Sequence, residues 1–152
     1  MNDRRDWGRS GQAGRPDLRG GTMRPWLGVL LVAIGGAIGA VARHGSNELC
    51  RRLLENTLGR FWPLSTLLVN VVGCFAIGVL MALHRREQLS DEWRLLLVTG
   101  GLGALTTFSA FSFDTLMLAR EDTFAMALLN TAANVLFCLL AVWLGWWLGG
   151  GQ

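Results

Sequence analysis

The sequence predicts an all-α membrane protein with four transmembrane helices, and three observations support this fold class. Of its 152 residues, 51% are hydrophobic and only 16% are charged, whereas charged residues make up about 25% of a typical soluble domain. Four long stretches contain no charged residue: 25–42, 61–83, 95–113 and 123–152. Each is close to the ~20 residues that a helix needs to cross a bilayer. This pattern excludes a disordered chain, a secreted disulfide scaffold and an ordinary soluble enzyme.

Positive charge is concentrated before the first apolar stretch. All 14 basic residues of the chain are arginines. Residues 1–24 contain six of them and three acidic residues, so this segment accounts for the whole formal net charge of +3. A segment that is rich in Gly and Arg and poor in apolar residues cannot bury enough surface to fold. We therefore predict that residues 1–24 form a disordered tail that contacts anionic lipid headgroups, and that nucleic acid is not a partner.

The apolar stretches predict four helices, at about 26–44, 62–83, 94–118 and 124–148. Tryptophans near the ends of these helices fit the role of interfacial anchors, namely Trp26, Trp62, Trp93, Trp143, Trp146 and Trp147. The first connection contains an amphipathic stretch at 47–60, which is compatible with a position on the membrane surface. The other two connections are expected to be short.

The arginines outside the tail lie on both sides of the predicted membrane region, so the positive-inside rule gives no clear orientation. This balance permits insertion in either direction, although the tail favours an N-terminus inside the cell. Four helices in so short a chain can hardly enclose an aqueous path, so a transport function would need an oligomer. The pairs Gly35–Gly39 and Gly145–Gly149 have the small-residue spacing that allows helices to pack closely.

Polar residues recur on one face of two predicted helices. Thr66, Asn70 and Cys74 follow one another at intervals of four residues on the second helix. Asn130, Asn134 and Cys138 do the same on the fourth helix. Hydrogen bonding between helices is one explanation, at roughly 0.6 kcal/mol per bond. The alternative is a path for an anion, because an amide is a neutral donor that binds an anion without trapping it.

The third predicted helix contains three glycines within four residues, at Gly100, Gly101 and Gly103. Each glycine disfavours a regular helix by roughly 1 kcal/mol. We therefore predict that this helix is broken near the bilayer midplane, where broken helices often form ion sites. Close packing of a Gly-rich helix is the alternative. Phe108 and Phe111 share a face of the same helix, which fits either core packing or contact of ring edges with an anion.

An arginine, an aspartate and the cysteines are further candidates for chemistry. Arg43 ends the first apolar stretch, where it either extends to the interface or lines an ion vestibule. Asp114 abuts the third stretch and is expected to be a structural partner or cap. The three cysteines have no CxxC spacing, and two of them fall within apolar stretches. The spacing therefore predicts neither a disulfide nor a metal cluster.

The sequence resembles the CrcB/Fluc family of fluoride channels. Three segments show the resemblance: GGAIGAVARH at 35–44, PLSTLLVNVVG at 63–73 and GGLGALTTFSAFSFD at 100–114. The third segment, with TTFS followed by Phe after one residue, is the most specific. The resemblance covers about residues 25–149, which it identifies as a four-helix channel domain.

Membership of this family would imply an antiparallel homodimer of dual topology in the inner (plasma) membrane. It would also imply two fluoride pores, passive export of fluoride and a central structural sodium ion. The resemblance makes Asn70, Phe108, Ser109 and Phe111 pore residues, places Arg43 at the vestibule and assigns the backbone carbonyls of Gly103 and Thr106 to sodium. The polar faces add Thr66, Asn130 and Asn134 to the pore. Two of these depart from the family pattern, because Asn130 replaces a frequent Tyr and Asn134 a Ser.

Two other functions remain possible from the sequence. A proton-coupled small multidrug exporter also has four helices and often dual topology, but it needs a carboxylate deep in the membrane. The only candidate is Asp114, which stands late in the third stretch. A non-transporting assembly subunit would explain the packing glycines and leave the asparagine faces without a role. An enzyme is not expected, because the chain shows no pairing of a nucleophile with a base.

Overall fold

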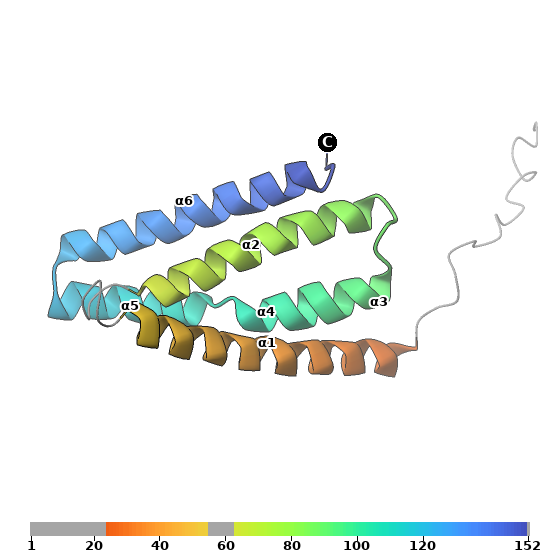
Figure 1. Ribbon diagram of the computed structural model, residues 1–152, viewed down its shortest axis with the longest axis horizontal. Coiled ribbons are helices and arrows are strands. Elements are labelled where there is room, and N and C mark those ends of the chain that lie inside the picture. The colour runs from red at the N-terminus through yellow and green to blue at the C-terminus, as the bar shows by residue number, and fades with distance from the viewer. Residues whose placement is uncertain (1–23, 55–62, 152) are drawn as a thin grey trace, which may run out of the picture.

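The computed structural model describes residues 24–54 and 63–151. Three predicted features lie outside the described residues: most of the tail, Trp62, and the end of the amphipathic stretch at 55–60. Helices account for nearly all of the described chain (Figure 1). In chain order they are α1 Pro25–Leu54, α2 Leu64–Arg85, α3 Asp91–Trp93, η1 Arg94–Leu102, α4 Gly103–Leu105, α5 Phe108–Glu121 and α6 Phe124–Leu148. The elements from α3 to α5 follow one another along a single span, so the chain crosses the bundle four times.

Four stretches of the structure are long and apolar enough to cross a membrane: Pro25–Cys50, Leu64–Arg85, Asp91–Glu121 and Phe124–Leu148. Large apolar side chains point outward along all of them, and Trp26, Trp93, Trp143 and Trp147 are each more than half exposed. A soluble protein would not leave so much apolar surface uncovered. The prediction of an all-α protein with four membrane-spanning helices is confirmed.

The first helix is longer than predicted. We expected it to end near His44 and a surface segment to begin after it, but α1 continues without interruption to Leu54. Gly45 alone does not end the helix, because one glycine disfavours it by only about 1 kcal/mol. An ion pair between Arg52 and Glu48, one turn apart at 2.7 Å, supports the added turns.

The bundle consists of two closely packed helix pairs, in which α2 packs on α6 and α1 packs on η1. The helices of each pair run in the same direction, and the two pairs run opposite to each other (Figure 1). Glycines set both contacts. A methyl group added at Gly145 would collide with the Phe75 carbonyl, and one added at Gly39 would collide with the Gly101 carbonyl. The close approach expected for glycines at this spacing is therefore confirmed.

The third span leaves the helical conformation at two residues. Thr106 and Thr107 are extended, with ψ of 154° and φ of −152° respectively, and α5 starts at Phe108. The glycine run itself stays helical, since it lies in the wide turns of η1 and the start of α4. Its glycines are used for close packing on α1, where Gly100 approaches the Val32 carbonyl. The predicted position of the interruption, at the glycines, was therefore wrong. Close packing of the glycines outweighs their weak helix propensity.

The α2–α6 contact leads to a first prediction. Gly145→Ala should destabilise the protein by about 1–3 kcal/mol, because overpacking a close helix contact forces the backbones apart. Thermal unfolding in detergent, followed by tryptophan fluorescence, measures this loss. Gly45→Ala is the matched control, since a methyl group there meets no atom within 4 Å. Equal melting temperatures for the two variants would contradict this account of the contact.

Candidate functional site

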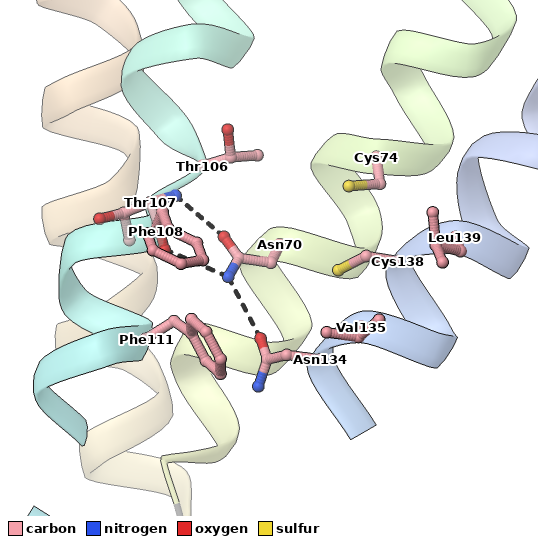
Figure 2. A pocket seen from close by; sticks show the side chains of 10 residues that line it. All are labelled: Asn70, Cys74, Thr106, Thr107, Phe108, Phe111, Asn134, Val135, Cys138 and Leu139. Carbon is pink, nitrogen blue, oxygen red and sulfur yellow. Dashed lines mark hydrogen bonds between the residues drawn. The ribbon is translucent and has the colours of Figure 1, made fainter. Parts of the chain in front are cut away.

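A cavity of about 330 Å³ opens where the interrupted third span meets α2 and α6. Figure 2 shows its wall, to which α2, α6 and the segment around the interruption contribute side chains. The residues that line it are Asn70, Cys74, Thr106, Thr107, Phe108, Phe111, Asn134, Val135, Cys138 and Leu139. No member of this set is charged. The cavity therefore combines apolar walls with a few neutral hydrogen-bonding groups.

Asn70 is the side chain that joins α2 to the interruption. Its Oδ1 accepts a hydrogen bond from the backbone N–H of Thr107 at 2.9 Å, and its Nδ2 donates to the Thr107 carbonyl at 3.3 Å. The amide thus pairs with both backbone groups of one extended residue. Backbone groups without a partner are costly in an apolar environment, so the buried Asn70 stabilises the interruption.

Thr107 also starts the next helix. Its side-chain hydroxyl accepts a hydrogen bond from the backbone N–H of Ala110 at 3.1 Å, which is the pattern of a helix N-cap. The same hydroxyl lies 3.0 Å from the Ser109 hydroxyl. One threonine therefore ends the extended segment and fixes the direction in which α5 begins.

A chain of amides continues from Asn70 across α6 to α5. Asn70 Nδ2 donates to Asn134 Oδ1 at 3.2 Å, and Asn134 Nδ2 donates to Asn130 Oδ1 at 3.1 Å. Asn130 is fully buried, and its Nδ2 donates to the Thr115 hydroxyl at 2.8 Å. Within the described residues, every buried side-chain nitrogen and oxygen has a hydrogen-bond partner. The asparagines of the two helix faces predicted from spacing thus meet in one connected network.

Phe108 and Phe111 lie beside the Asn70 amide (Figure 2). Their ring centroids are 5.3 Å apart and the rings are tilted by 57°. Phe111 is buried, whereas Phe108 is 79% exposed on the single chain. The edge of an aromatic ring bears partial positive charge. The pair can therefore offer weak attraction to an anion while keeping water away.

The other predicted site residues lie around this cavity. Thr66 is buried on α2 and its hydroxyl donates to Asp114 Oδ2 at 2.7 Å. Ser109 is exposed at the start of α5. Arg43 is half-buried within α1 and does not line the cavity. Gly103 precedes the interruption, and Thr106 forms part of it. The structure therefore places four of the seven predicted pore residues on the cavity wall: Asn70, Phe108, Phe111 and Asn134.

Sequence reasoning missed Thr107 and Thr115. The signal for Thr107 was its position directly before a helical stretch, where threonine is a favoured N-cap. The role of Thr115 depends on the register between α5 and α6, which the sequence does not contain. Among the described residues, no group of three or more His, Cys, Asp or Glu side chains is placed to bind a metal ion. A cation here would have to use backbone oxygens or a smaller set of side chains.

Comparison with known proteins identifies relatives of this chain. Residues 30–146 match the family model described as CrcB-like protein, Camphor Resistance (CrcB). Proteins named "Fluoride-specific ion channel FluC" from Shewanella sp. (strain W3-18-1) and Shewanella oneidensis are each 45% identical over 117 residues. The protein of this name from Shewanella amazonensis is 44% identical over the same length. Each alignment covers 77% of this chain and 91% of the relative.

The cap at Thr107 gives a second prediction. Thr107→Val should destabilise the protein by about 0.5–2 kcal/mol, the usual range for loss of an N-cap. It should also speed hydrogen–deuterium exchange of the amides at the start of α5. Thr131→Val is the matched control, because Thr131 donates only to the Ala127 carbonyl within α6. If the two variants exchange at α5 equally, Thr107 does not cap this helix.

Proposed function

The chain belongs to the CrcB family, and on this premise we propose that it is a fluoride-selective ion channel. It would export cytoplasmic fluoride passively across the membrane and so reduce fluoride toxicity. The structural observation that supports this function is the Asn70 amide beside the rings of Phe108 and Phe111 in an uncharged cavity. The family membership also places the protein among channels and not among enzymes.

The chemistry of the cavity suits a small, strongly hydrated anion. Fluoride must exchange its water shell for other donors when it enters a narrow path. The Nδ2 bonds of Asn70 to Thr107 and Asn134 are 3.3 Å and 3.2 Å long, near the weak end of the normal range. A charged acceptor forms a shorter and stronger bond than these carbonyls. Asn70 could therefore share its N–H groups with fluoride while its Oδ1 stays bonded to the Thr107 N–H.

The same reasoning assigns roles to the remaining polar residues. Asn134 and Asn130 continue the line of amides from Asn70 and would extend the path along α6. Ser109 and Thr66 would add hydroxyl donors at its sides. Arg43, half-buried on α1, would attract fluoride into the vestibule without binding it inside the pore.

We further propose an antiparallel homodimer of dual topology in the inner (plasma) membrane. Phe108 borders the cavity and is 79% exposed on one chain, so a second subunit is needed to enclose the path. Arginines occur on both sides of the spans, which permits insertion in both orientations. Two chains related in this way would contain two equivalent pores.

A structural sodium ion would fit at the centre of such a dimer. Thr106 stands in the middle of the 31-residue third span, so we place the interruption near the bilayer midplane. Thr107 N–H bonds to Asn70 and Ala110 N–H bonds to the Thr107 hydroxyl. In a continuous helix these donors would pair with the carbonyls of Gly103 and Thr106. The two carbonyls thus lose their helical donors, and oxygens of this kind suit a hard cation.

A proton-coupled small multidrug exporter is the alternative function. It would require a carboxylate that exchanges protons with a cationic substrate within the membrane. Asp114 is the candidate, but its Oδ2 accepts a hydrogen bond from Thr66 and it does not line the cavity. The named relatives are fluoride channels, and they do not favour this alternative.

Fluoride release from liposomes tests the proposed function. The reconstituted protein should release fluoride in an electrogenic manner and nearly exclude chloride. Asn70→Ala should slow the release about 10- to 100-fold, because a hydrogen bond to a charged group contributes about 1.5–3 kcal/mol. Phe108→Ile should also slow it by at least about tenfold, equivalent to ~1.4 kcal/mol.

The controls for this experiment are Asn47→Ala on α1 and Phe113→Ile on α5. Both residues are exposed, and neither lines the cavity. Size-exclusion chromatography should show a dimer for every variant. An absence of fluoride flux from a correctly folded wild-type dimer would refute the channel function.

The sodium site is tested by ion replacement. Protein purified with choline in place of sodium should melt at a lower temperature, and added sodium should restore the melting temperature in a concentration-dependent way. The melting temperature should rise because a ligand that binds only the folded state stabilises it. This stabilisation is about 2.7 kcal/mol when the sodium concentration is 100 times the dissociation constant. Potassium at equal ionic strength is the control for a general salt effect. Equal melting temperatures in sodium and choline would refute the proposed sodium site.

A further inference from the structure

Cys74 and Cys138 meet on the cavity wall one helical turn beyond the asparagine pair. Each cysteine follows its asparagine, Asn70 or Asn134, by four residues. Because α2 and α6 run in the same direction and are closely packed, the contact between the asparagines is repeated by the cysteines. Both cysteines line the cavity (Figure 2).

We propose that Cys74 and Cys138 together form a binding site for a soft d10 cation of the class of Cu(I) and Ag(I). Both cysteines are free and half-buried, and they face a cavity in which an ion can reach them. Sulfur ligands select soft cations over hard ones such as sodium. Cations of this class accept two sulfur ligands arranged in line, so a pair of thiols from two helices is a complete site.

The binding step leaves no net charge in the apolar cavity wall. One thiol releases its proton to water, and its sulfur forms a bond to the cation. The other thiol stays protonated and donates a sulfur lone pair to the same cation. The single positive charge of the cation then balances the single thiolate, and no atom is oxidised or reduced. A neutral product avoids the large penalty for an unpaired charge in an apolar environment.

A cation at this position would also obstruct the proposed ion path. It would lie one turn from the Asn70 amide, within the same cavity as the Phe108 ring. This part of the inference depends on the proposed channel function, whereas the binding itself does not. The cysteine pair therefore makes the channel sensitive to thiophilic cations.

Silver binding to the purified full-length protein tests the site. Silver nitrate in a chloride-free buffer is the probe, and titration calorimetry measures affinity and stoichiometry. The expected result is one tightly bound silver ion per chain, with one proton released on binding. Cys74→Ser and Cys138→Ser should each weaken this binding by at least about tenfold, the lower end of the loss seen for groups that only support a metal ligand.

Cys50→Ser is the matched control, because Cys50 is half-buried on α1 and does not line the cavity. This variant should keep the tight site unchanged. Cys74→Ala and Cys138→Ala repeat the measurement in case a serine disturbs the packing, and gel filtration verifies the fold of each variant. Silver binding that is unchanged in both Cys74 and Cys138 variants, or two silver ions bound independently, would overturn the proposal.

Fluoride release separates this inference from the proposed function. Silver should suppress release by the wild type and by Cys50→Ser, but not by Cys74→Ser or Cys138→Ser. A protein that binds silver at the pair and never conducts fluoride refutes the channel function and leaves the site intact. A protein that conducts fluoride without binding silver at the pair refutes the thiol site alone.

Discussion

The structure depends on how one buried amide satisfies a backbone that leaves the helical conformation. A membrane-spanning segment cannot expose peptide groups to lipid, because no water is present to pair with them. Asn70 meets this requirement by bonding to both the N–H and the carbonyl of Thr107. The interruption of the third span and the polar wall of the cavity are therefore two consequences of the same side chain.

Close packing places the partners of this amide. Gly78 and Gly145 bring α2 and α6 so near that added methyl groups would collide with opposite backbone carbonyls. At this separation short side chains meet directly, so the hydrogen bond between Asn70 and Asn134 forms about two to three turns before the glycines. The glycines thus act on the site from a distance, by fixing the register in which the two polar faces meet.

The sequence contained enough to predict four spans, because the absence of charge over a bilayer-length stretch is a strong local signal. It also indicated the polar faces, since a spacing of four residues sets a helix face whatever lies opposite. It misplaced the interruption, because the glycines of η1 pack on α1 and remain helical while Thr106 and Thr107 become extended. The network to Thr115 and the cysteine pair depend on the register between helices, which local spacing does not determine.

One hydrogen bond links the two proposed ion sites. When Thr107 N–H turns to Asn70, it leaves the Gly103 carbonyl that it would pair with in a continuous helix. Through the same rotation of the backbone, the proposed anion path would gain an anchored amide and the proposed cation site would gain a carbonyl without a helical donor. The groups at both proposed sites are neutral. Neither ion would therefore face a fixed opposite charge within the cavity wall. A cation held by these carbonyls at the centre of the proposed dimer would in turn keep Thr106 extended, and would so hold the Asn70 amide in the orientation that the proposed anion path requires.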